Sequence, residues 1–213
     1  MDMSSEDKNL SEGLFKTTYN VGGTESKELK NFKGPSKAVD LDVRFAENFT
    51  NTGGKFIYCE STKNFVQLMD SLKAQNDWNH VYVWDHHIKN YILSLGFKQE
   101  EFEFFMDNSD AAMSDCFGLI ADEGVVLLTP DQATNRRLTS FPPHHIIIAT
   151  RANLIESLDR GLDRFKDQFF DKLPSLIELN PERNICKANH ARLLNASGTA
   201  NVYVFYIDVP QLG

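Results

Sequence analysis

Apolar residues recur three or four positions apart in four stretches of the chain, and this spacing predicts four helices. The first runs from Ala38 to the Gly53-Gly54 pair, where glycine ends a helix readily. Ser61 or Thr62 caps the second, whose apolar face extends to Leu72. The third follows Asp85 and ends before Gly96. A long fourth helix is expected to begin with Asn153 as its cap, and its inner face is expected to carry Leu154, Ile155, Leu158 and Leu162.

Short unbroken apolar runs lie between these helices and predict buried strands at residues 56–59, 80–84, 116–120, 125–128, 145–149 and 202–207. The early alternation of helix and strand indicates crossover connections and parallel strands. Only Ala121–Gly124 separates two of the runs, and four residues are too few for a crossover helix. The predicted fold is therefore a three-layer α/β/α domain whose mostly parallel sheet carries an antiparallel hairpin.

Residues 1–36 are rich in Ser, Glu, Lys, Gly and Asn and show no periodicity, which predicts a flexible or loosely docked arm before a single domain at 37–213. The net charge of −8 argues against nucleic acid or an anionic membrane as the main partner. No signal-peptide pattern opens the sequence, and no apolar run reaches the ~18 residues of a membrane span. Three widely spaced cysteines offer neither a disulfide framework nor a C-x-x-C motif, so we expect a reducing cytoplasm.

The usual cofactor signatures are absent: there is no G-x-G-x-x-G, no phosphate-binding loop and no G-x-S-x-G. His86-His87 follows a predicted strand beside Asp85, at the end of the sheet where open α/β proteins bind ligands. A metal or acid–base role is one interpretation. Neighbouring residues on a helix point about 100° apart, which favours the other interpretation, a polar helix start with exposed imidazoles.

Charged and titratable residues crowd the stretch between residues 120 and 145. Asp122, Glu123 and Gly124 form a predicted turn, the Arg136-Arg137 pair follows, and His145 opens a strand. An arginine fork binds carboxylate or phosphate well, so these residues suggest a small-anion pocket with Arg137 as clamp, His145 as donor or acid–base group and Asp122 as their orienting partner. An ordinary hairpin turn and a solvated sheet rim explain the same residues.

The order A-D-x-G, then R-x-x-S-x-x-P-x-H-I, resembles the LUD domain of the lactate utilization protein C family. The matching residues are Ala121, Asp122, Gly124, Arg137, Ser140, Pro143, His145 and Ile146. Family members often read G-P-S-x-T-A-D near the C-terminus, and this chain matches that motif at Ser197, Thr199 and Ala200. It departs from the family at Glu123 and Val125, where threonines are usual, and at Asn201, where the family has aspartate.

The resemblance implies a fold of the NagB, ribose-5-phosphate isomerase and CoA-transferase group. It also implies an accessory role beside two iron–sulfur proteins that oxidise L-lactate to pyruvate. Since the cysteines do not cluster, any iron–sulfur cluster is expected on the partners, and no metal is expected on this chain. The ligand-binding candidates are Asp122, Glu123, Gly124, Arg136, Arg137, His145, Ser197 and Thr199.

Two alternatives remain from other functional classes. One is an independent CoA-transferase-like or small-carboxylate-processing enzyme in which Glu123 is the nucleophile. The other is a ligand-sensing regulator; the acidic charge and the absence of a helix-turn-helix pattern argue against direct DNA binding.

Overall fold

The computed structural model describes residues 40–83, 85–98, 102, 106–132, 141–170, 175–178, 192–195 and 201–212, and the predicted N-terminal arm lies outside them. The main sheet has five parallel strands in the order β1 (Lys55–Cys59), β10 (Asn201–Ile207), β6 (His144–Thr150), β3 (Ala111–Ser114) and β2 (Val81–Val83). A second, mixed sheet has the order β7 (Leu154–Ile155), β4 (Gly118–Ile120), β5 (Val125–Leu128), β8 (Ser175–Glu178) and β9 (Arg192–Asn195).

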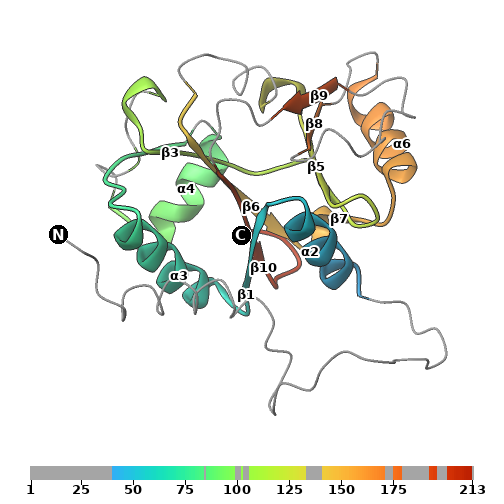
Figure 1. Cartoon of the computed structure of the whole chain (residues 1–213). Coiled ribbons are helices and arrows are strands. Elements are labelled where there is room, and N and C mark those ends of the chain that lie inside the picture. Colours follow the sequence, from blue (N-terminus) through green and yellow to red (C-terminus); the bar gives the residue numbers. More distant parts are fainter. Residues whose placement is uncertain are drawn as a thin grey trace, which may run out of the picture.

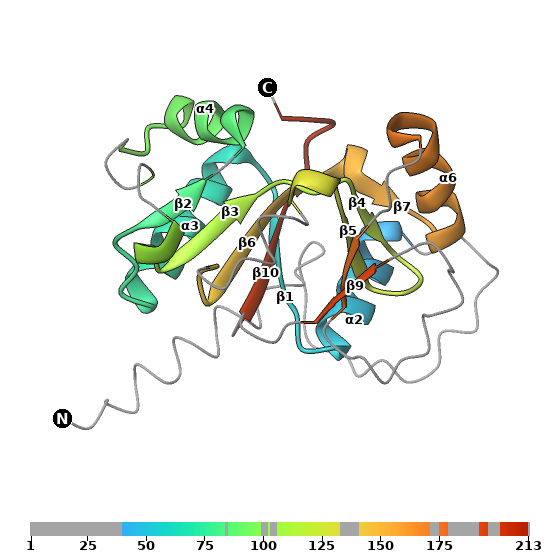
Figure 2. The same ribbon diagram turned by 90° about the horizontal axis from the view of Figure 1, so that it is seen from above.

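Helices cover both sheets (Figures 1 and 2). Their bounds are α2 (Leu41–Asn51), α3 (Thr62–Gln75), α4 (His86–Ser94) and α6 (Leu158–Phe169), with short 3-10 turns η2 (Met106–Asn108) and η3 (Arg151–Asn153). One face of the main sheet packs against α3 and α4. The other face packs against α2 and the second sheet, and α6 covers the far side of that second sheet. The predicted three-layer α/β architecture is confirmed.

Three details of the predicted fold are wrong. The antiparallel hairpin β4–β5 is not part of the main sheet but the centre of the second one. The last helix begins at Leu158 after Ser157, whereas Asn153 ends η3 and the next two residues form strand β7. β3, β7, β8 and β9 were not predicted, and β3 lies inside the main sheet between β2 and β6.

Other local predictions are confirmed. The Ser61 hydroxyl caps α3 by accepting a 3.2 Å hydrogen bond from the Asn64 N–H. Gly53 has a positive φ of 95° just beyond the end of α2, the conformation in which glycine ends helices. Among the described residues, no helix is both long and apolar enough to cross a membrane.

Candidate functional site

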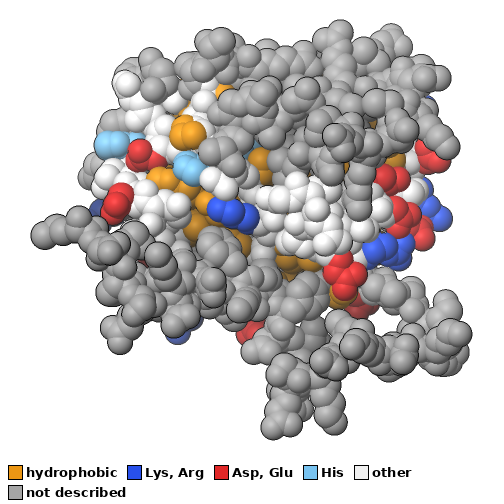
Figure 3. Space-filling model, in the orientation of Figure 1, with side chains coloured by type: hydrophobic (Ala, Val, Ile, Leu, Met, Phe, Trp, Pro, Cys, Tyr) orange, Lys and Arg blue, Asp and Glu red, His pale blue; other side chains and the backbone are white. Residues whose placement is uncertain are grey.

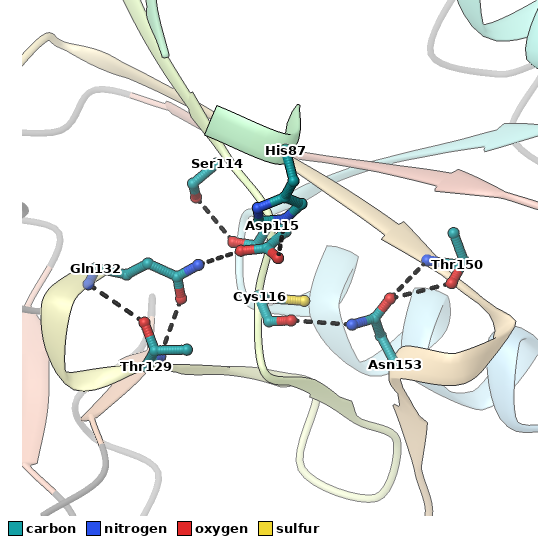
Figure 4. A network of polar contacts seen from close by, with 8 residues as sticks. All are labelled: His87, Ser114, Asp115, Cys116, Thr129, Gln132, Thr150 and Asn153. Carbon is teal, nitrogen blue, oxygen red and sulfur yellow. Dashed lines mark hydrogen bonds and ion pairs between the residues drawn. The ribbon is translucent and has the colours of Figure 1, made fainter. Parts of the chain in front are cut away.

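Polar side chains follow β2 and β3 at the point where each strand ends. Asp85 comes two residues after β2 and precedes α4, while Asp115 comes directly after β3. Because these strands are neighbours and parallel, their carboxyl ends lie at the same edge of the sheet. His87, in the first turn of α4, reaches the same place (Figure 4). Ligands of open α/β sheets bind at this kind of edge.

Asp115 is the centre of a hydrogen-bonded network (Figure 4). His87 Nε2 lies 2.8 Å from its Oδ2, and the Gln132 side-chain amide donates to its Oδ1. Gln132 is held in turn by Thr129, whose N–H donates to Gln132 Oε1 at 2.9 Å and whose hydroxyl accepts from the Gln132 N–H at 3.3 Å. The chain after β5 thus fixes a buried amide against the Asp115 carboxylate.

Burial makes both carboxyl groups hold their protons more firmly, and at Asp85 the charge of Asp115 adds to this effect. Burial first, then the charge of Asp115, raises the pKa of Asp85 to about 6, although His87 acts in the opposite direction. Burial likewise raises the pKa of Asp115, again against the effect of His87. Oδ2 of Asp85 is buried and has no hydrogen-bond partner among the described residues. The edge therefore offers a buried acceptor beside a carboxylate–imidazole pair.

A second chain of contacts joins this edge to the core. The Ser114 hydroxyl donates to the Asp115 carbonyl at 2.8 Å and lies 2.9 Å from His145 Nε2. Since its one hydrogen is used for Asp115, the Ser114 oxygen accepts from the imidazole N–H. His145 is fully buried, and its ring meets the edge of Phe141 with centroids 5.2 Å apart. His145 is therefore part of the packed interior.

The turn at Ala121–Gly124 is bound to α2. Arg44 pairs with Asp122 at 2.5 Å, and the Asn48 amide donates to the carbonyl oxygens of Ala121 at 2.9 Å and Asp122 at 3.1 Å. Gly124 has a positive φ of 64°, and a Cβ at this position would lie 2.4 Å from the Asn48 carbonyl carbon. Glycine is thus required both by the backbone conformation and by the close approach of the helix.

The comparison with known families fits the same central region. The sequence model of the LUD domain matches residues 95–204, just over half of the chain. The chain belongs to the LUD domain family. No curated protein matches it. A crystal structure of a DUF162 family protein from Deinococcus radiodurans is similar, with a TM-score of 0.53 over 81% of this chain and 99% of that chain; at 11% identity this likeness shows the fold.

The LUD match includes Asp115, Gln132 and His145 but begins after Asp85 and His87. Of the predicted ligand-binding residues, Asp122 and Glu123 lie on the turn bound to α2, whereas His145 contacts Ser114 and Phe141. Among the described residues, no defined contact joins Asp122 to His145. Burial raises the pKa of Glu123, which is half-buried in this turn.

Four more predicted ligand-binding residues lie outside the described residues: Arg136, Arg137, Ser197 and Thr199. The register pairs Asn201 with His144, so β10 begins directly beside the start of β6.

The sequence interpretation missed Asp115 and Gln132. The sequence signal for this edge of the sheet was Asp85-His86-His87. Asp115, which pairs with His87, follows strand β3, and that strand was not predicted. Within the described part of the chain, no three His, Cys, Asp or Glu side chains are grouped to hold a metal ion.

Proposed function

We propose that this LUD-domain protein is an accessory component of lactate utilization that binds L-lactate, or a similar small 2-hydroxy acid, at the carboxyl edge of the main sheet. The observation that carries the proposal is the buried Oδ2 of Asp85, an acceptor without a donor among the described residues, beside the Asp115–His87 pair. A buried acceptor left unpaired is costly, and the hydroxyl of a 2-hydroxy acid supplies the donor. A 2-oxo acid has no such hydrogen.

The carboxylate of the ligand has a complementary position at the start of α4. Asp85 is the N-cap residue of this helix, yet its side chain makes no capping hydrogen bond. The first amide groups and the positive end of the helix dipole favour an anion there. The His87 side chain lies in the same turn and is 61% exposed, and its imidazolium form adds an Nδ1–H donor. The ligand hydroxyl would then point to the carboxyl pair and its carboxylate to the helix start.

The redox step is assigned to partner proteins. Cys59 and Cys116 are buried, and burial raises the pKa of Cys59 to about 12 and that of Cys116 well above its ordinary value. Such thiols do not favour the thiolate form that an iron–sulfur cluster needs, and Cys186 lies outside the described residues. In this proposal the clusters belong to iron–sulfur partners, and this chain positions the hydroxy acid and accepts its hydroxyl proton.

The alternative of a CoA-transferase-like enzyme receives less support. Its nucleophile would be Glu123, which lies on the turn that α2 holds and not at the carboxyl edge. Burial raises the pKa of this carboxyl and so disfavours the ionised, nucleophilic form.

Thermal denaturation in the presence of L-lactate, pyruvate or acetate tests the proposal. A ligand at about 100 times its dissociation constant adds roughly 2.7 kcal/mol of apparent stability. We expect L-lactate to stabilise the protein more than pyruvate or acetate, and Asp85→Asn to remove the difference. The matched control is Asp70→Asn, the same change on the exposed side of α3, which should keep the full response. Equal stabilisation by all three acids, or an unchanged response in Asp85→Asn, would refute the hydroxyl contact.

A further inference from the structure

A single buried amide serves both carboxyl groups of the carboxyl edge. Gln132 is 2% exposed and comes four residues after β5, so it reaches the main sheet from the second one. Its side-chain amide donates to Asp115 Oδ1. A side-chain hydrogen bond from Gln132 also lowers the pKa of Asp85, against the effect of burial. The two acids therefore share one neutral donor.

The helix start that contains Gln132 fixes the orientation of its amide. Residues 129–132 read T-P-D-Q, and a helix begins at Pro130. The Thr129 hydroxyl accepts from the Gln132 N–H at 3.3 Å, and the Thr129 N–H donates to Gln132 Oε1 at 2.9 Å. This reciprocal pair is a capping box. Because Thr129 holds the amide oxygen, the amide NH2 group is the end that faces Asp115.

A neutral donor gives Asp115 a different environment from that of the acids at the surface. On the face shown in Figure 3, acidic side chains lie beside basic ones. Arg160 and Glu156, for example, are 3.2 Å apart and well exposed. The amide of Gln132 binds one oxygen of Asp115 without cancelling its charge. That charge remains available to His87, which lies 2.8 Å from the other oxygen.

We propose that Gln132 is the positioning residue of the carboxyl edge, and that its amide holds Asp115 and Asp85 as acceptors for the hydroxyl of a ligand. The role rests on the proposed lactate site and names the residue that maintains its preference for a hydroxy acid over an oxo acid. An ionised carboxylate accepts an O–H group more strongly than a protonated one. By donating to these carboxylates, Gln132 favours the form that burial disfavours.

The first test needs no ligand. Gln132→Met keeps the length of the side chain and removes the donor. The pKa values of Asp115 and Asp85 should each rise by about one pH unit, because the hydrogen bond that favours the ionised form is lost. NMR titration of the carboxyl carbons measures both. The matched control is Gln67→Met, the same change on the exposed side of α3, which should leave both titrations unchanged.

A second variant separates positioning from helix capping. Glutamate takes the place of glutamine in capping boxes, so Gln132→Glu keeps the contact with the Thr129 N–H. Only the donor toward Asp115 is lost, and a carboxylate oxygen replaces it. The pKa of Asp115 should then rise further than in Gln132→Met, because a like charge is added to the loss of the donor. If Gln132 acted only as a cap, this variant would keep the native response to ligand.

The ligand response is the ratio of the Kd values for pyruvate and L-lactate, measured by calorimetry. Both ligands are carboxylate anions, so the ratio isolates the hydroxyl contact from the overall charge of the site. We expect the native protein to prefer L-lactate and both Gln132 variants to reduce that preference about tenfold, the effect of one hydrogen bond to a charged acceptor. Gln67→Met should keep the native preference.

Two outcomes overturn the positioning role of Gln132. One is that Asp115 and Asp85 titrate alike in Gln132→Met and Gln67→Met. The other is that Gln132→Glu keeps the native preference for L-lactate. A native protein without any preference for L-lactate would refute the proposed function instead. The titrations without ligand would still decide whether Gln132 sets the state of the two acids, so the two proposals fail separately.

Discussion

The two ends of the main sheet carry groups of opposite charge, and burial shifts the pKa of both sets toward the neutral form. At the carboxyl end, burial raises the pKa of Asp85 and Asp115. At the amino end, burial lowers the pKa of Lys55 and His144. In each case the low-dielectric surroundings disfavour the charged form. The carboxyl end therefore carries acidic groups and the amino end basic ones, and burial holds each group closer to its neutral form.

The stability of the protein should respond to pH in opposite directions at the two ends. The folded state holds the Asp85 proton up to about pH 6, whereas the unfolded state loses it near 3.8, so stability falls as the pH rises through that window. The pKa of His144 lies below its ordinary value of 6.5 in the folded state. The unfolded state then takes up this proton first, and stability falls as the pH drops below about 6.5.

The largest expected effect comes from His145, which lies between the two ends. This fully buried residue follows His144 and donates to Ser114, whose hydroxyl contacts the Asp115 carbonyl. His145→Ala leaves a cavity and removes the N–H that donates to the Ser114 hydroxyl oxygen, so the free energy of unfolding should fall by about 3 kcal/mol in urea denaturation. The exposed His86→Ala should change it by less than about 0.5 kcal/mol. A similar small change in both variants would mean that His145 does not support the two ends.

The sequence predicted the elements whose own pattern specifies them. The helix after Ser61, for example, carries both a cap and an apolar face at helical spacing. β3 could not be found in this way because its residues, Ala-Ala-Met-Ser, include none that favours strands. It becomes a strand because β2 and β6 bond it on both sides. The start of α6 was wrong for a related reason: the Asn153 side chain completes the η3 turn with Thr150 and does not cap a helix.

The candidate site was predictable only in part for the same physical reason. Asp85, His86 and His87 could be placed at a strand end, since the apolar run before them is plain in the sequence. Asp115 could not, because its place depends on β3. The hairpin motif pointed to Asp122, but no sequence pattern shows that Arg44 would approach it from a helix 78 residues earlier. Tertiary contacts, not local sequence propensity, decide which carboxylates pair with an arginine, as Asp122 does with Arg44, and which lie at the carboxyl edge of the sheet.

The next largest effect tests the carboxyl end by its pH dependence. Asp85→Asn removes a group that must ionise while buried, and no capping hydrogen bond is lost. A rise in pKa of about two units, discounted for solvent screening, corresponds to on the order of 1–2 kcal/mol. Melting curves from pH 4 to 8 should therefore show the variant gaining stability relative to the native protein as the pH rises to about 6. A constant difference across this range would contradict the raised pKa.

The smallest expected effect tests the amino end without any ligand. Lys55→Met loses the hydrogen bond to Tyr203 and the contact with its ring, which should cost no more than about 1 kcal/mol. Its informative effect is on His144, whose pKa should rise because the neighbouring positive charge is gone. NMR titration of the imidazole in Lys55→Met, with Lys73→Met beside it, measures this directly. If the two variants titrate alike, Lys55 exerts no field on His144, and the amino end lacks the positive potential that sets it apart from the carboxyl end.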